Sequence, residues 1–331
     1  MRDVAALAGV SLKTVSRVVN REAGVTDELV ARVTAAAERL DYRPNLTASS
    51  LRRGDGRTRT IGLLLDNIAN PFSASLYGAI EEVARPLGVV VLAGSLDEDG
   101  DRERGLAESF IARRVDGLII APTRADQSYL QNDQLAGTAL VFVDRAPTLL
   151  AADSVTSTNA DGARVATQHL LDHGHRRIAF LGVQTKISTG AQRHAGYCDA
   201  LDRAGLTAEP ALVRQGLRSS EEARGALLEM LDLPEPPTAV FASQVLLNIG
   251  AIQALRDRGL QHRVALVGFD DVSLADLIDP PVTLVAQDVP EMGRIAATRL
   301  FARLDGDESP PQQLLVPTTL VVRGSGEIRP T

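Results

Sequence analysis

Eight short runs of apolar residues recur from residue 61 onward, and segments long enough for helices separate them. Strands of a parallel sheet are covered by helices on both faces, so they appear in a sequence as continuous apolar runs. More than six such strands in one chain predict an α/β fold of two doubly wound lobes. The runs lie at 61–66, 89–93, 117–121, 139–144, 178–182, 239–242, 264–270 and 282–286.

Many enzymes share this architecture, so we searched for their sequence signatures. The chain contains no GxxxxGK[ST] phosphate loop, no GxGxxG opening a helix and no GxSxG nucleophile turn. His173 and His175 flank a glycine just before a strand, but such pairs more often form a solvated turn, and no third ligand lies nearby in the sequence. We therefore expect no enzymatic activity, no cofactor and no metal.

The composition indicates a soluble protein of the reducing cytoplasm. Hydrophobic residues make up 44% of the chain, but no apolar run reaches the roughly 18 residues that a membrane span needs. Met1 leads directly into a charged amphipathic helix, so no signal peptide is expected. Cys198 is the single cysteine, which excludes an intramolecular disulfide and suits a small buried side chain better than a catalytic thiol.

Two short helices joined by a tight turn are predicted at residues 2–20. Val4 and Ala8 stand at helical spacing before Gly9, which suits the left-handed residue that closes a helix. Ser11 suits the N-cap of the second helix. This pattern is typical of a helix-turn-helix DNA reader, although an ordinary amphipathic hairpin shows it too. The side chains left pointing outward on the second helix are Leu12, Lys13, Thr14, Ser16 and Arg17.

A third helix is predicted at residues 26–40, with Thr26 as its N-cap. Pro44 cannot continue a helix but can begin one, and residues 46–53 have a helix-compatible composition. A helix this short is not stable alone in water, so we expect it to fold on a partner. Leu51, which arginines follow, could enter a DNA minor groove and open a base step. The apolar stripe of the third helix consists of Leu29, Val30, Val33, Ala37 and Leu40.

Charge is distributed unevenly along the chain. Residues 1–60 contain eleven Arg or Lys and seven Asp or Glu, a net charge of +4, although the whole chain carries −7. A basic end on an acidic body is expected when one end contacts phosphates and the rest does not. Nucleic acid is therefore the predicted partner of the N-terminal segment.

Three motifs, GVSLKTVSRVVN from Gly9, YRPN from Tyr42 and ASSLRRG from Ala48, resemble the headpiece and hinge of the LacI/GalR family of bacterial transcription regulators. The resemblance extends over nearly the whole chain. It implies a headpiece at 1–43, a hinge helix and linker at 44–60, and a periplasmic-binding-protein-like effector and dimerisation domain at 61–331. The lobes it implies are about 61–158 plus 288–316 and about 159–287 plus 317–331. The DNA-binding residues it implies are Ser11, Leu12, Lys13, Thr14, Ser16, Arg17, Asn20, Tyr42, Asn45, Ala48, Leu51 and Arg52.

In open α/β lobes, ligands bind just beyond the carboxyl ends of the strands, so the residues after each apolar run are candidates. Carboxylates and an arginine suit a polyhydroxylated ligand, because each can form two hydrogen bonds of fixed geometry. An Asp at a strand end can equally cap a helix, and Phe72 could belong to the core. The resemblance and this rule together predict the effector-binding residues Asn67, Phe72, Asp144, Asn159, Arg193, Arg218, Gln244 and Asp270.

Several of these positions depart from the family pattern. Thr158 stands where an Asp is usual, and Gln244 and Val245 stand where the family commonly has Asn-Asp. Leu217 and Arg218 replace an acidic residue and an aromatic one. The loss of carboxylates and the gain of Arg218 favour, as an alternative to a sugar, a non-sugar or anionic metabolite.

The resemblance implies a sequence-specific repressor whose operator affinity is controlled by a small molecule, a sugar or sugar derivative, bound between the lobes. Family members usually carry a few more residues before the first helix, including a Thr that caps it, so either that cap is absent here or the true start lies upstream of Met1. No leucine-rich heptads end the chain, so we expect a homodimer on a near-palindromic DNA operator. A transporter's solute-binding protein would need a signal peptide, and an enzyme would need a catalytic constellation. The pattern leaves open whether the effector is an inducer or a corepressor.

Overall fold

The chain folds into two units, residues 1–59 and residues 60–331. The computed structural model describes residues 1–19, 24–42, 57–271 and 274–330. Within these ranges no helix combines the length and apolar character that crossing a membrane requires. The expected hinge helix lies outside the described residues, as do the predicted DNA contacts Asn20, Asn45, Ala48, Leu51 and Arg52.

The helices of the first unit are α1 (Arg2–Ala8), α2 (Leu12–Val19) and α3 (Asp27–Arg39). Gly9 adopts the predicted left-handed conformation, with φ of 64°. The amide of Thr14 donates to Ser11 Oγ at 3.1 Å, so the predicted N-cap of α2 is confirmed. Met1 stands at the N-cap of α1, and its side chain makes no capping hydrogen bond. Gly9 ends α1 and Ser11 begins α2, so the two helices meet across one tight turn.

The apolar stripe predicted for α3 is only partly buried. Val33 joins a core with Val4 and Val15, whereas Val30 is 39% exposed and Leu40 is 44% exposed. The two short helices that pack on α3 cannot cover a wide stripe, because a unit of this size buries only a small core. Thr26 occupies the N-cap position of α3, but its side chain makes no capping hydrogen bond.

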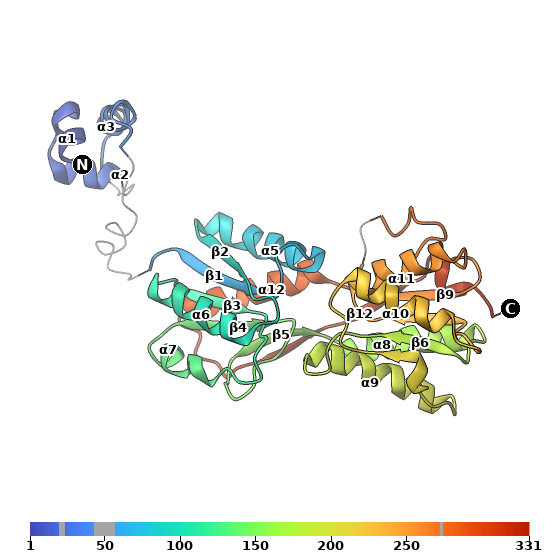
Figure 1. Ribbon diagram of the computed structural model, residues 1–331. Coiled ribbons are helices and arrows are strands. Elements are labelled where there is room, and N and C mark those ends of the chain that lie inside the picture. Colours follow the sequence, from blue (N-terminus) through green and yellow to red (C-terminus); the bar gives the residue numbers. More distant parts are fainter. Residues whose placement is uncertain (20–23, 43–56, 272–273, 331) are drawn as a thin grey trace. The chain divides into compact units, whose positions relative to one another are not determined.

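Two six-stranded sheets, one in each lobe, form the second unit (Figure 1). Each contains the doubly wound order in which the lobe's first strand lies between its second and third, so the predicted fold class is confirmed. The first sheet, in spatial order, is β11 (Gln313–Val316), β5 (Asp153–Ser157), β4 (Ala139–Val143), β3 (Gly117–Ile120), β1 (Thr60–Leu65) and β2 (Val90–Ser95). The second is β12 (Thr318–Val321), β10 (Thr283–Gln287), β9 (Ala265–Phe269), β8 (Ala239–Ala242), β6 (Ile178–Leu181) and β7 (Val213–Arg214).

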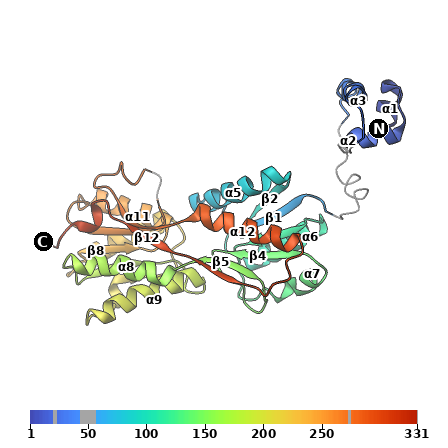
Figure 2. The same cartoon turned by 180° about the vertical axis from the view of Figure 1, so that it is seen from behind.

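Helices cover both faces of each sheet, as the view from behind also shows (Figure 2). Those of lobe one are α5 (Pro71–Ala84), α6 (Gly100–Ala112), α7 (Gln131–Leu135) and α12 (Val289–Leu304). Those of lobe two are α8 (Asn159–Asp172), α9 (Ser188–Arg203), α10 (Ser220–Leu231) and α11 (Val245–Asp257). Short 3-10 turns are η1 (Arg85–Leu87), η2 (Ser128–Leu130), η3 (Pro210–Leu212) and η4 (Ser325–Glu327).

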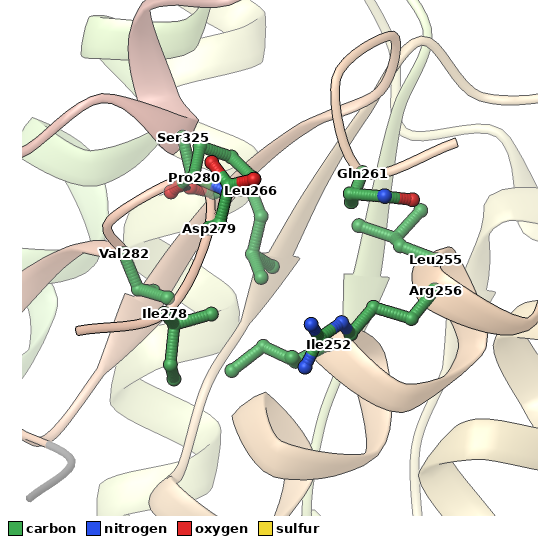
Figure 3. Close-up of a pocket in the computed structure, with 10 residues that line it drawn as sticks. All are labelled: Ile252, Leu255, Arg256, Gln261, Leu266, Ile278, Asp279, Pro280, Val282 and Ser325. Carbon is green, nitrogen blue, oxygen red and sulfur yellow. Dashed lines mark hydrogen bonds between the residues drawn. The ribbon is translucent and has the colours of Figure 1, made fainter. Parts of the chain in front are cut away.

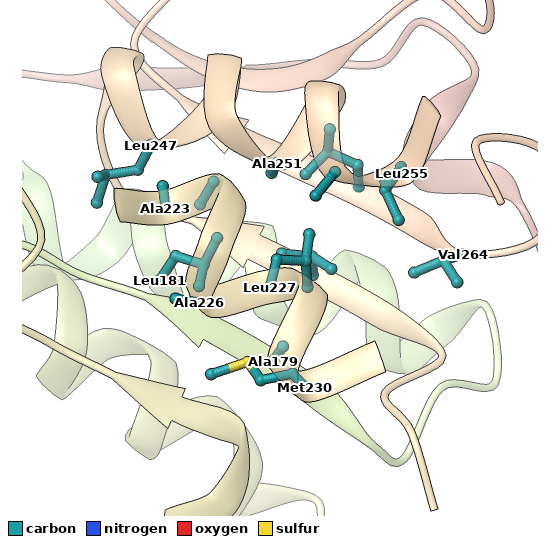
Figure 4. Packing of buried hydrophobic residues seen from close by; sticks show 14 of the residues in the cluster. Ala179, Leu181, Ala223, Ala226, Leu227, Met230, Leu247, Ala251, Leu255 and Val264 are labelled. Atoms are coloured by element: carbon teal, nitrogen blue, oxygen red, sulfur yellow. The ribbon is translucent and has the colours of Figure 1, made fainter. Parts of the chain in front are cut away.

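Side chains alternate between the two cores on either side of each sheet. In lobe two, Leu181 of β6 packs with Leu227 of α10 and Leu247 of α11 (Figure 4). Its neighbour Phe180 points to the opposite side and packs with Tyr197 of α9. Continuous apolar strands follow from this arrangement, because both faces of the sheet are buried.

Four strands, β5, β7, β11 and β12, were not predicted from the sequence. β5 reads Asp-Ser-Val-Thr-Ser and carries no apolar run. Its Asp153 is buried and accepts hydrogen bonds from Arg303 Nε at 2.7 Å and from Arg299 Nη2 at 3.2 Å. Charge pairing with α12 therefore stabilises a strand that has little hydrophobic character of its own.

The described chain passes between the lobes at Thr158, Asp288 and Pro317. The amide of Thr318 donates to Thr158 Oγ1 at 3.0 Å, and the two hydroxyl oxygens lie 3.1 Å apart. The amide of Thr158 also donates to the Val316 carbonyl. Two of the crossings are thus joined side by side by hydrogen bonds, so they can bend together when the lobes move.

Candidate functional site

A cleft of about 760 Å³ separates the two lobes. Residues at or just beyond the carboxyl ends of the strands line it, including Asp66 after β1, Asp144 after β4, Gln244 after β8, Asp270 after β9 and Gln287 at the end of β10. Doubly wound sheets bind ligands at this edge, because the connections leave a crevice there. The cleft is large enough for a small metabolite.

Asp144 and Asp270 take the same unusual backbone conformation in the two lobes. Their φ angles are 67° and 68°, in the left-handed region that Asp tolerates better than most side chains. The amide of Asp144 donates to the Val155 carbonyl and that of Asp270 to the Val285 carbonyl, each at 2.9 Å. Each strand therefore ends in the same sharp turn, which directs one carboxylate toward the cleft.

Arg193 and Asp270 form a buried ion pair on lobe two, with Nη1 and Oδ2 3.5 Å apart. The guanidinium also donates to Asn159 Oδ1 at 2.8 Å and to the Ser243 carbonyl at 2.7 Å, and it lies 3.8 Å from the centre of the Phe269 ring. These contacts hold its planar donors in one orientation.

The Asp270 carboxylate is held on both oxygens. Oδ1 accepts from Gln287 Nε2 at 2.5 Å, and Oδ2 accepts from the amide of Val245, the first residue of α11, at 3.3 Å. A buried charge is stable only when such partners replace the water it has lost. The pair therefore presents a rigid, charged surface to a ligand.

Close packing of α9 on α8 brings Arg193 to this place. A Cβ atom added at Gly196 would lie 2.1 Å from the Ala160 carbonyl oxygen, so only glycine permits this approach. The hydroxyl of the next residue, Tyr197, donates to the Ile178 carbonyl at 2.8 Å and anchors α9 to β6. Gly196 and Tyr197 thus set the position of the arginine that precedes them on the same helix.

Lobe one contributes a cluster of charges. Arg145 donates to both oxygens of Glu98, at 3.1 and 2.5 Å, and its Nε lies 3.4 Å from Asp144 Oδ2. The amide of Glu98 donates to Asp66 Oδ1 at 2.9 Å. Burial, and then the negative charge of Glu98, raises the pKa of Asp66 to about 6. Burial also raises the pKa of Asp144, while Arg145 and Arg193 oppose that rise.

Seven of the eight predicted effector residues line the cleft: Asn67, Phe72, Asp144, Arg193, Arg218, Gln244 and Asp270. Asn159 is the exception and corrects the prediction. It is buried behind Arg193 and orients the guanidinium, so it does not line the cleft. Thr158, at the neighbouring position, also lies outside the cleft lining and joins the lobe crossings.

Three of the lining side chains also serve the fold. Gln244 Oε1 caps α11 by accepting from the amide of Leu246 at 2.9 Å. Phe72 is half-buried and packs against the core beneath α5 while lining the cleft, so both readings of this residue apply. Asn67 Oδ1 accepts from the amide of Ala69 at 2.9 Å, which shapes the loop after β1.

Four further residues that line the cleft were not predicted as site residues: Asp66, Glu98, Arg145 and Gln287. Asp66 and Gln287 stand at strand ends, so the rule that selected Asp144 could have found them. Glu98 lies in the loop after β2, at a φ of 54°, and no local sequence signal marks it. Only the folded lobe brings Glu98 to Arg145.

The predicted DNA-contacting side chains of α2 are exposed or half-buried. Ser11, Leu12 and Lys13 are exposed. Thr14 Oγ1 lies 2.9 Å from Ser11 Oγ. The amide of Tyr42 donates to the Ala37 carbonyl at 2.8 Å, and its ring packs on the headpiece core. The helix therefore presents a short polar and cationic surface, which also includes the half-buried Ser16 and Arg17.

Two other features carry no site. His175 is buried, and both of its ring nitrogens have partners, Thr238 Oγ1 at 2.9 Å and the Ile328 carbonyl at 2.7 Å. A small cavity between Ile252, Leu266 and Val282 measures about 20 Å³ (Figure 3). A space of that size holds one water molecule and no metabolite.

Comparison with known proteins gives matches at both ends of the chain. The family described as "Bacterial regulatory proteins, lacI family" matches residues 1–45, and "Periplasmic binding protein-like domain" matches residues 167–326. The ribose operon repressor of Escherichia coli (strain K12) is 33% identical over 328 residues, covering 98% of this chain and 99% of that protein.

Solved structures of regulators share the fold. The lac repressor dimer bound to operator and the anti-inducer ONPF matches with a TM-score of 0.85 at 28% identity, covering 98% of each chain. The complex of the transcriptional regulator CelR with cellobiose matches with a TM-score of 0.73 at 31% identity, again covering 98% of each chain.

Proposed function

This chain belongs to the LacI family of bacterial regulatory proteins, and we propose that it is a repressor whose operator affinity is controlled by a carbohydrate in the cleft. As a member of that family it is a DNA-binding transcriptional regulator. The observation that carries the proposal is the buried Arg193–Asp270 pair facing Asp144 across the cleft. Charged groups with fixed geometry suit hydroxyl groups at fixed positions on a sugar ring.

The comparisons support a sugar as the effector. The relative with 33% identity is named for ribose, and one matching structure contains cellobiose. Phe72 can cover the apolar face of a sugar ring, and among the described residues that line the cleft it is the one aromatic side chain. A purine or pyrimidine base would gain from two aromatic faces, so this cleft favours a non-aromatic, polyhydroxylated ligand.

The proposed mechanism is a linkage between two binding sites. Operator DNA favours one arrangement of the lobes, in which paired hinge segments can fold with Leu51 in the minor groove. The effector favours another closure of the lobes, which bends the crossings at Thr158, Asp288 and Pro317. Each ligand then weakens the other by the same coupling free energy, on the order of 1–3 kcal/mol. We propose an inducer; a corepressor would give the opposite sign.

For the DNA end, we propose that a homodimer places two headpieces on a near-palindromic operator in the cytoplasm. The exposed residues Leu12 and Lys13, together with Arg17, would contact bases and phosphates in the major groove. Two-fold symmetry of the protein then matches two-fold symmetry of the DNA. The effector would be bound and released without chemical change.

A thermal-shift screen of the purified chain against sugars, followed by operator binding, tests the proposal. A true effector raises Tm, because it binds only the folded state, and it changes operator affinity about 5- to 150-fold. The shift should vanish in Asp144→Asn, whose fold is checked by circular dichroism. It should persist in Asp271→Asn, a matched exposed position that pairs with Arg323 instead. A hit that survives Asp144→Asn would show that the sugar binds elsewhere.

A further inference from the structure

We propose that the effector carries an anionic substituent, a phosphate or carboxylate, which is held on lobe two by Thr189, Lys186 and Arg218. This inference rests on the proposed carbohydrate effector and adds the charge of the ligand and its orientation. All three residues line the cleft. They come from the start of α9 and from the loop between β7 and α10.

The N-terminus of α9 opens into the cleft. This helix is 16 residues long, its N-cap is Ile187, no side chain caps its first amides, and its first turn contains no acidic residue. Ile187 and Thr189 both line the cleft. Amides at a helix start have no partner within the helix, and the helix dipole makes that end positive, so both features favour an anion.

Thr189 supplies an independent observation. The residue is only 6% exposed, yet its hydroxyl has no hydrogen-bond partner in the part of the chain that the structure describes. Its hydroxyl oxygen is not among the fully buried polar atoms, so it is accessible from the cleft. Because Thr189 lines the cleft, an acceptor oxygen of a bound ligand would satisfy it.

Two cations stand beside this helix end. Lys186 and Arg218 are exposed at the cleft, and neither makes an ion pair with a described residue. The third cation of this wall, Arg193, is already paired with Asp270. Glu222 Oε2 accepts from the Arg218 amide at 2.7 Å, but the side chains of Lys186 and Arg218 remain available to a ligand anion.

The opposite wall has the opposite charge. Acidic side chains dominate the cleft lining of lobe one, and its single arginine, Arg145, is paired with Glu98. Carboxylates accept hydrogen bonds from sugar hydroxyls but repel an anion. The ligand therefore binds with its hydroxyl groups on lobe one and its anionic group on lobe two. The acidic residues are Asp66, Asp97, Glu98, Asp99 and Asp144.

Isothermal titration calorimetry of the full chain with matched ligand pairs tests this inference. The pairs are ribose with ribose 5-phosphate and glucose with glucose 6-phosphate, and gluconate supplies the carboxylate arm. We expect the anionic form of one sugar to bind about 10- to 100-fold more tightly than its neutral parent, the range expected for one charge-assisted hydrogen bond. Comparison of the sugar phosphates with gluconate shows whether the site prefers a phosphate or a carboxylate.

Substitutions in lobe two test where the anionic group of the ligand binds. Lys186→Gln with Arg218→Gln should abolish the preference for the anionic form of the sugar, and Thr189→Val should reduce that preference. Arg176→Gln, an exposed cation of lobe two outside the cleft lining, should leave the preference unchanged. Equal affinity for neutral and anionic partners would overturn the inference and leave the carbohydrate proposal standing. A preference that persists in the double variant would also overturn it. No binding by any member of the panel would overturn both.

Discussion

Asp144 and Asp270 occupy matching positions in the two lobes, each the first residue after its strand and each in a left-handed conformation. Each amide donates to the neighbouring parallel strand, at Val155 or Val285. Burial is the main cause of the raised pKa of Asp144, and Arg145 and Arg193 oppose the rise. The negative charge of Asp270 raises this pKa further, so the two carboxylates interact across the cleft. The repeated lobe architecture thus delivers one carboxylate from each side to a common ligand.

Asp270→Asn should keep the backbone turn, because Asn also tolerates the left-handed region. Loss of the charge should weaken effector binding about 10- to 100-fold, since one charge-assisted hydrogen bond is lost. It should also lower the free energy of unfolding by about 3–5 kcal/mol, because Arg193 keeps a buried charge without its partner. Calorimetry and urea unfolding measure the two effects. Unchanged stability would mean that the Asn159 and Ser243 contacts alone satisfy Arg193.

Gly196→Ala should destabilise lobe two by several kcal/mol and weaken effector binding, because the added Cβ would force α9 away from the Ala160 carbonyl. Gly225→Ala in α10 is the matched control, since nothing lies within 4 Å of a Cβ there. That control should stabilise the fold by about 0.5–1 kcal/mol through helix propensity. Thermal unfolding of both variants checks the contrast. Equal effects of the two substitutions would contradict the packing argument.

Asp66 should make stability depend on pH between about 4 and 7. Its pKa of about 6 in the folded protein lies above the ordinary value of 3.8, so the folded state holds the proton more tightly than the unfolded chain does. This contribution is full below about pH 4 and is lost as pH rises through 6.

Asp66→Asn removes that loss. The free energy of unfolding of the variant, relative to that of the native chain, should be about 1–2 kcal/mol higher at pH 7.5 than at pH 4.5. This size allows for solvent screening of a half-buried group. Unfolding curves at the two pH values give the difference. Asp116→Asn is a suitable control, because Asp116 lies outside the cleft lining. A pH-independent difference between native and variant would refute the assignment to Asp66.

Thr158→Val should weaken the coupling between effector and operator. It removes the acceptor for the Thr318 amide and the contact between the two hydroxyls, so the crossings can move separately. We expect affinity for each ligand alone to change less than threefold, while the effect of one ligand on the other falls by half or more. Operator titrations with and without effector measure this. Thr185→Val, an exposed threonine, serves as the control.

Lys13→Gln should reduce the slope of log affinity against log salt by about 1 for each headpiece that loses a phosphate contact. Lys13 is exposed on α2, where a cation can reach the DNA backbone. Fluorescence anisotropy at several salt concentrations measures the slope. Arg39→Gln at the end of α3 is the matched exposed control and should leave it unchanged. A lower affinity with an unchanged slope would mean that Lys13 contacts a base.

The sequence by itself determined the elements whose signals are local. Gly9 and Ser11 mark the headpiece turn because their conformational and capping preferences act within one helical turn. Apolar runs marked eight of the strands, because strands buried on both faces are apolar throughout. The rule that ligands bind beyond the carboxyl ends of parallel strands then selected Asp144 and Asp270.

Tertiary structure decided the rest. β5 is a strand because Arg299 and Arg303 of α12, far along the chain, neutralise its buried Asp153. Asn159 lies behind Arg193 because Gly196 lets α9 approach α8, a contact that no single segment encodes. Glu98 reaches Arg145 across 47 residues of chain. Contacts between residues so far apart in the sequence produce no periodic pattern in it, because the energy of each contact depends on which elements pack together.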